Sequence, residues 1–166
     1  MGESLTDSTR VWRSSSPEET EALGARLAAS RPAGADALIT IHLAGDLGAG
    51  KTTLARGFLH ASGIPGAIRS PTYTLLETYE TARGPVVHLD LYRLQDPSEL
   101  EPLGLRDLAL PGHVWLVEWP QRGEGWLPAP DLLLTLSVGS GAQAGTHGIS
   151  ASALTPAGRS WLGKVA

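Results

Sequence analysis

The sequence contains no cysteine, which excludes disulfide bonds and thiolate metal sites. It also has no apolar run near the roughly 20 residues that a transmembrane helix requires. We therefore expect no membrane association and a cytoplasmic location. Residues 1–10 are polar and carry no apolar signal core, so we expect them to form a disordered tail.

Basic charge is scarce as well. The 13 lysine and arginine residues are outnumbered by 17 aspartate and glutamate residues, and the formal net charge is −4. A chain of this charge has no overall attraction to a phosphate backbone. We therefore expect no DNA partner, and contact with tRNA only indirectly, through another protein. The sequence has just two lysines, Lys51 and Lys164.

The remaining composition is that of a globular protein. With 166 residues and 42% hydrophobic content, the chain is long enough for one core, so we expect a single domain over residues 11–166. Apolar runs typical of strands occur at residues 38–44, 86–92 and 113–118, and weaker ones at 11–12, 73–79, 132–138 and near Ile149. Helical patterns begin at Pro17, Thr52 and Pro156. Strands interleaved with helices predict an α/β fold, with a central mixed parallel and antiparallel sheet flanked by helices.

A phosphate-binding motif follows the apolar run at 38–44. The segment fits G-x-x-x-x-G-K-[ST], whose glycines let successive backbone N–H groups face an anion at the start of a helix. Lys51 is expected to reach the β and γ phosphates, and Thr52 to ligate Mg²⁺. The alternative is a glycine-rich turn that only caps a helix. The predicted nucleotide-binding residues here are Gly45, Asp46, Leu47, Gly48, Ala49, Gly50, Lys51, Thr52 and Thr53. The motif predicts a P-loop NTPase-like domain.

Two acids end apolar strands and are the candidates for catalysis. Asp90 and Glu118 should point to the edge of the sheet where ligands bind in α/β proteins. P-loop catalysis requires a carboxylate near Mg²⁺ and a group that orients the attacking water. We predict that both acids are catalytic together with Lys51, and that both belong to the metal site. Which acid is the ligand and which orients water stays open, and a surface acid or a structural ion pair is the alternative for each.

The nucleotide is expected to be ATP, because the chain has neither the N-K-x-D guanine motif nor a D-x-x-G switch after its second strand. Trp119 follows Glu118, where it could stack on adenine, cover the site or pack in the core. His88 shares a strand face with Asp90, yet a lone histidine in such a run is expected to be a packing residue without a chemical role.

Four separate blocks resemble the TsaE (YjeE) family in order and spacing, over roughly residues 16–130. They are Gly45–Thr53, Ser70–Leu75, His88–Leu94 and Val117–Pro120. The resemblance implies an ATPase that works with the TsaB–TsaD complex when threonylcarbamoyl is attached to the adenosine beside the tRNA anticodon, and whose activity alone is weak. It also implies that Ser70 and Thr72 act as a switch near the γ-phosphate.

Two other functions remain compatible with a P-loop. A small-metabolite kinase would need an acceptor pocket and an arginine-rich lid, whereas the arginines of this sequence are scattered. A nucleotide-gated binding module without turnover would not need both acids.

Overall fold

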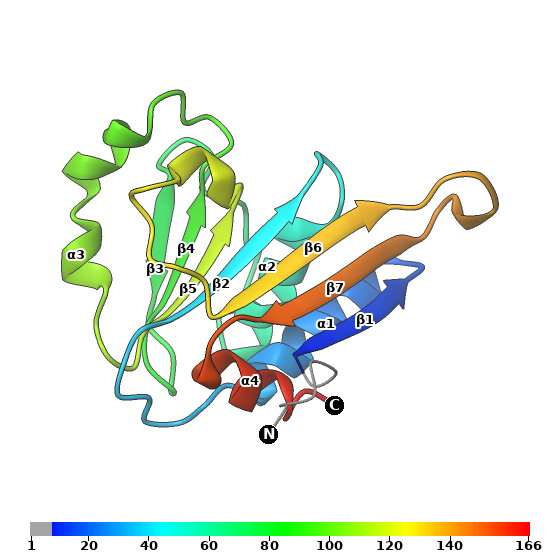
Figure 1. Cartoon of the computed structure of the whole chain (residues 1–166), viewed down its shortest axis with the longest axis horizontal. Coiled ribbons are helices and arrows are strands. Elements are labelled where there is room, and N and C mark those ends of the chain that lie inside the picture. Colours follow the sequence, from blue (N-terminus) through cyan, green and yellow to red (C-terminus); the bar gives the residue numbers. More distant parts are fainter. Residues whose placement is uncertain (1–7) are drawn as a thin grey trace, which may run out of the picture.

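The structure is a computed structural model that describes residues 8–166. Its seven-stranded sheet has the order β1-β7-β6-β2-β5-β4-β3 (Figure 1). The strands are β1 (Thr9–Ser14), β2 (Ile39–Gly45), β3 (Leu76–Tyr79), β4 (Val86–Asp90), β5 (Val114–Glu118), β6 (Leu132–Val138) and β7 (His147–Ala153). The helices are α1 (Pro17–Ala29), α2 (Lys51–Ala61), α3 (Leu105–Leu108) and α4 (Pro156–Leu162), with 3-10 turns η2 (Pro97–Leu103), η3 (Pro120–Gly123) and η4 (Gly141–Gln143).

The sheet is mixed, as the sequence predicts. Strands β6, β2, β5 and β4 run parallel to one another, and β2, β5 and β4 carry the continuous apolar runs that suit strands buried on both faces. The outer strands β3, β7 and β1 pair antiparallel. The carboxyl ends of β2, β4 and β5 therefore meet at one edge.

Helices α1 and α2 pack together against one face of the sheet, behind it in Figure 1. Two glycines allow their close approach. A Cβ on Gly24 would lie 2.1 Å from the Leu54 carbonyl oxygen, and one on Gly57 would lie 2.1 Å from the Glu21 carbonyl oxygen. Substitution of either glycine would push apart the two helices whose amino ends border the predicted phosphate site.

The opposite face is covered unevenly. A second apolar cluster joins β4 and β5 to the segment around η2 and α3, with Trp115 and Leu100 fully buried in it. These short helices are not predicted from the sequence, because their residues lack a sustained helical period. The same face of β6 stays largely exposed. None of the described helices is long and apolar enough to cross a membrane.

Two predicted boundaries are wrong. The strand expected at residues 73–79 begins only at Leu76, because Leu75 adopts a left-handed conformation (φ 68°) and its N–H donates to the Pro71 carbonyl in a turn. The tail expected at residues 1–10 ends earlier, since Thr9 and Arg10 belong to β1 and pair with β7. The rest of that tail, residues 1–7, lies outside the described residues.

Candidate nucleotide site

A cleft of about 450 Å³ opens at the carboxyl ends of β2, β4 and β5. It contains most of the predicted site residues, brought together from four separate segments. Gly45, Asp46 and Ala49 do not line it: Gly45 and Asp46 face Lys51 through their carbonyl oxygens, and Ala49 is buried. The cleft is lined by Ser15, Ser16, Pro17, Thr20, Leu47, Gly48, Gly50, Lys51, Thr52, Thr53, Ser70, Thr72, Asp90, Tyr92, Glu118, Trp119, Gly145 and His147.

The P-loop depends on glycine where the backbone turns. Gly48 and Gly50 have φ angles of 78° and 107°, which side-chain-bearing residues rarely adopt. Gly45 faces a different constraint, since a Cβ there would lie 2.3 Å from the Leu136 carbonyl oxygen. The loop can therefore turn its N–H groups toward the cleft while remaining packed against β6.

Lys51 is the one lysine or arginine among the described residues that line the cleft, and it is almost fully buried. Its Nζ donates to the carbonyl oxygens of Gly45 at 2.6 Å and Asp46 at 2.7 Å. Burial lowers the pKa of Lys51, and the negative charges of Glu118, Asp90 and Asp46 oppose this shift. The ammonium thus has negative groups on several sides and a position from which it can exchange carbonyl partners for phosphate oxygens.

Asp90 and Glu118 lie directly opposite each other on neighbouring parallel strands. Both are buried, with 4% and 2% of their surface exposed. Glu118 Oε1 accepts a 2.7 Å hydrogen bond from Thr52 Oγ1, the hydroxyl of the P-loop motif. Because each acid ends its strand in the same register, the sheet itself holds the carboxylates beside the phosphate loop.

The predicted switch residues contact the other acid. Ser70 Oγ and Thr72 Oγ1 both donate to Asp90 Oδ2, the latter at 3.2 Å, and Ser70 Oγ also lies 3.4 Å from Glu118 Oε2. The backbone N–H of Tyr92 donates to Asp90 Oδ1 at 3.0 Å. Asp90 is therefore connected to the switch segment, and Glu118 to the P-loop.

His88 makes a contact that is not predicted from the sequence. It is fully buried, as a packing residue would be, but its Nε2 lies 2.6 Å from Glu118 Oε2. Its Nδ1 has no hydrogen-bond partner. Thr52 and His88 thus each contact a different carboxylate oxygen of Glu118. The spacing of two residues between His88 and Asp90 was the available signal, since it places both on one face of β4.

Trp119 lies over the lysine. Its backbone is left-handed (φ 58°), and Lys51 Nζ lies 4.2 Å from the centroid of its ring system. Tyr92 packs against it with ring centroids 5.0 Å apart, and the Arg122 guanidinium lies 5.6 Å from it. Trp119 thus lies over the ammonium, and it also packs partly against the second apolar cluster.

Part of the cleft wall comes from segments without a phosphate-binding or catalytic motif. Ser16 and Thr20 contribute from the start of α1, and His147 from the start of β7. His147 Nδ1 lies 2.8 Å from the carbonyl oxygen of Ala49 in the P-loop. Since His147 follows the P-loop by almost a hundred residues and carries no pattern, only the pairing of β7 with β6 reveals it.

The donor set suits Mg²⁺ better than a metal held by protein alone. No group of three or more histidine, cysteine, aspartate or glutamate residues that could hold a metal ion occurs within residues 8–166. Thr52, Glu118 and Asp90 instead offer a hydroxyl and carboxylate oxygens next to an open cleft. Mg²⁺ prefers such sites, in which one or two protein oxygens act together with phosphate oxygens and water.

Comparison with known proteins assigns the family. The family model described as "Threonylcarbamoyl adenosine biosynthesis protein TsaE" matches residues 14–144 of this chain. A Haemophilus influenzae relative named "tRNA threonylcarbamoyladenosine biosynthesis protein TsaE" is 50% identical over 98 residues, which cover 59% of this chain but only 62% of the relative, less than two thirds of its length. A Bacillus subtilis relative of the same name is 41% identical over 125 residues, covering 75% of each chain.

A solved structure agrees with the sequence relatives. The crystal structure of Bacillus subtilis YdiB superimposes with a TM-score of 0.68 at 30% identity, covering 89% of this chain and 86% of YdiB. The shared architecture is the α/β fold with the mixed seven-stranded sheet. The chain belongs to the TsaE family, the tRNA threonylcarbamoyladenosine biosynthesis proteins.

Proposed function

We propose that this protein binds ATP with Mg²⁺ in the P-loop cleft and hydrolyses it. It does so as a cytoplasmic partner of the TsaB–TsaD complex, which attaches threonylcarbamoyl to the adenosine beside the tRNA anticodon. One observation carries the hydrolytic part: Thr52 of the P-loop and the acid pair Asp90 and Glu118 share a hydrogen-bonded cluster next to Lys51. The names of the relatives support the pathway.

The phosphates of ATP are bound by the P-loop backbone and by Lys51. On binding, Lys51 Nζ exchanges the carbonyl oxygens of Gly45 and Asp46 for phosphate oxygens. Trp119 covers the same ammonium and limits the access of water to it. Ser16 and His147 line the wall of the same cleft and can border the base of ATP.

The contacts of the two acids suggest different roles. Glu118 shares a hydrogen bond with Thr52, so these two residues would hold Mg²⁺, which neutralises charge on the β and γ phosphates when bound. Asp90 is bonded to Ser70 and Thr72 of the switch segment, and we assign to it the orientation of the attacking water. His88 fixes the second oxygen of Glu118, so that Oε1 stays directed at Thr52.

Two alternatives fit less well. A small-metabolite kinase would need cations that shield the transferred phosphoryl group, yet Lys51 is the only lysine or arginine among the described residues that line the cleft. A binding module without turnover leaves the burial of two acids beside the P-loop unexplained. Buried carboxylates are costly unless hydrogen bonds or a metal compensate them.

Phosphate release from ATP and Mg²⁺ tests the proposal. The purified protein is assayed alone, and then with TsaB, TsaD and tRNA, and we expect slow release that the partners change. Lys51→Ala serves as the matched variant and should weaken ATP binding in calorimetry by at least about tenfold without loss of the fold, because it removes a charge-assisted contact to phosphate.

Each alternative has its own outcome. Phosphate that appears on an added acceptor rather than in solution would indicate a kinase, and ATP binding without release under any condition would indicate a binding module. Unchanged ATP affinity in folded Lys51→Ala would refute the phosphate site itself.

A further inference from the structure

A second pocket, of about 550 Å³, lies at the opposite edge of the sheet from the nucleotide cleft. Its wall includes Arg31, whose guanidinium donates to the carbonyl oxygens of Gly84 and Pro85, just before β4, and of Gly112, before β5. The amino ends of β4 and β5 therefore border this pocket, whereas their carboxyl ends border the cleft. We call it the basic pocket. It is lined by Arg26, Ala29, Ser30, Arg31, Pro32, Ala33, Arg83, Lys164 and Ala166.

Four of these residues are cations, and among the described residues no aspartate or glutamate lines the basic pocket. Such a concentration is unexpected in a chain with a formal net charge of −4 and only 13 lysine and arginine residues. One of the two lysines of the chain is here, and the other is the P-loop lysine. The basic pocket is thus locally positive, whereas the formal net charge of the whole chain is negative.

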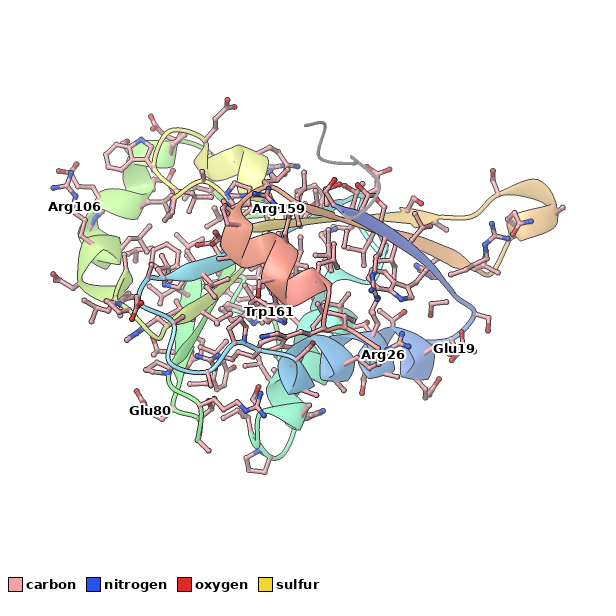
Figure 2. All side chains as sticks on the ribbon, turned by 60° about the horizontal axis from the view of Figure 1, so that its bottom comes forward. Glu19, Arg26, Glu80, Arg106, Arg159 and Trp161 are labelled. Atoms are coloured by element: carbon pink, nitrogen blue, oxygen red, sulfur yellow. The ribbon has the colours of Figure 1, made fainter. Side chains whose placement is uncertain are left out.

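Within residues 8–166, no carboxylate forms an ion pair with any of the four cations. In the described part of the chain, neither Arg26 nor Lys164 makes a side-chain hydrogen bond or an ion pair. Figure 2 shows Arg26 on α1, close to the end of α4 that leads to Lys164. Both side chains are on exposed residues and can reach a ligand in the pocket.

The other two cations belong to the wall. Arg83 Nη1 donates to the carbonyl oxygens of Ala29 at 3.0 Å and Arg31 at 3.2 Å, and no carboxylate of residues 8–166 pairs with either arginine. Burial, and then the charge of Arg83, lower the pKa of Arg31. Because arginine stays protonated in proteins, the pocket keeps two positive charges close together. An anion would relieve this repulsion.

We propose that the basic pocket binds a phosphate group, carried either by an RNA backbone or by a small phosphate compound. Guanidinium groups match phosphate through paired N–H donors, and an ammonium adds a point charge, so the residue types suit this ligand. A peptide that carries carboxylates also has negative charge, but it is a different class of ligand from the proposed phosphate group. The expectation from net charge, that RNA is reached only through another protein, does not take account of this local cluster.

The test is an NMR titration of the full-length protein labelled with ¹⁵N, first with inorganic phosphate and then with an RNA hairpin. Signals from residues 26–33, 83 and 164–166 should shift, and they are separate from those of the P-loop. Binding at the basic pocket is therefore read independently of the proposed ATPase. Arg26→Ala combined with Lys164→Ala should weaken this binding about tenfold or more, since it removes both free cations.

A matched double variant controls for charge. Arg106→Ala combined with Arg159→Ala removes the same charge from exposed arginines that lie apart from Arg26 in Figure 2 and outside the basic pocket. Tighter binding of RNA than of phosphate, with a salt dependence reduced by about one unit of slope per cation removed, assigns the site to RNA. Equal or exclusive binding of phosphate assigns it to a small compound. The proposal is refuted if these signals do not shift, or if both double variants weaken binding equally.

Discussion

Thr52 Oγ1 donates to Glu118 Oε1 at 2.7 Å, and this bond joins the phosphate loop to the end of a strand 66 residues further along the chain. The corresponding partners of Asp90 are Ser70 and Thr72 in the switch segment. Two acids at the same level of the sheet therefore face different parts of the site. Their substitution should produce different defects.

Glu118→Gln and Asp90→Asn should each lower the rate of ATP hydrolysis by about 10²- to 10⁴-fold. ATP affinity should change little, or rise, because the phosphates lose a repulsive carboxylate while Lys51 and the P-loop amides remain. Glu118→Gln should in addition require more Mg²⁺, whereas Asp90→Asn should stay slow at any Mg²⁺ concentration. Single-turnover hydrolysis across a Mg²⁺ titration measures both effects.

If Asp90→Asn were instead the variant rescued by Mg²⁺, Asp90 would be the metal ligand and Glu118 would orient the attacking water. A wild-type rate in either variant would make that residue a structural acid.

His88 should act on hydrolysis through Glu118. His88→Leu removes the contact at 2.6 Å and leaves a buried carboxylate oxygen without this partner, so we expect kcat to fall about 10- to 100-fold. His88→Gln places an amide nitrogen near the position of Nε2 and should restore much of the loss. Calorimetry should give similar ATP affinities for both variants, and thermal unfolding checks the fold. Equal rates for the two variants would mean that His88 only fills space.

Much of this site could be predicted from the sequence, because its components end strands that are marked by apolar runs. The strand at residues 132–138 has the bounds expected of it, and Asp90 and Glu118 face each other because each closes a buried strand. The contact of His88 with Glu118 could not be predicted in the same way. It depends on the register between β4 and β5, which local patterns do not specify.

The predicted start of the strand at residues 73–79 is wrong for a local reason. Residues 73–79 are rich in threonine, tyrosine and leucine, which favour a strand, but tertiary contacts impose a turn. Leu75 adopts a left-handed backbone conformation, which is unfavourable for a residue with a side chain. Its carbonyl oxygen accepts a hydrogen bond from the N–H of Asp90. A residue in such a conformation is identified only from the structure.

The segment of residues 69–76 should respond to the γ-phosphate. Ser70 and Thr72 donate to Asp90 in the present structure, and an added phosphate and metal offer their hydroxyls other partners. We expect slower hydrogen exchange of residues 69–76 with a non-hydrolysable ATP analogue and Mg²⁺ than with ADP and Mg²⁺. The exchange of β6, which lies outside the switch, serves as the internal control. Equal protection of 69–76 in both states would leave the segment with a structural role.

The buried His42 in β2 should make the stability of the protein depend on pH. This histidine is 8% exposed and its Nε2 has no hydrogen-bond partner. Burial lowers its pKa from 6.5 to about 4, against smaller opposing effects from the Pro128 backbone and Asp131. The unfolded chain therefore takes up a proton below about pH 6.5, whereas the folded protein does so only near pH 4. The stability that neutral His42 contributes to the folded protein is complete above about pH 6.5, and it is lost as the pH falls toward 4.

Between about pH 7 and pH 5, this difference should reduce the free energy of unfolding by about 2 kcal/mol. Urea denaturation of the wild type and of His42→Gln at both pH values isolates the effect, because all other titrating groups are shared. The loss of stability on acidification should be about 2 kcal/mol smaller in His42→Gln. His60→Gln, at an exposed histidine of α2, is the matched control and should behave as the wild type. If His42→Gln loses as much stability as the wild type, the folded protein accepts the proton at His42 without penalty, and the buried position is open to water at low pH.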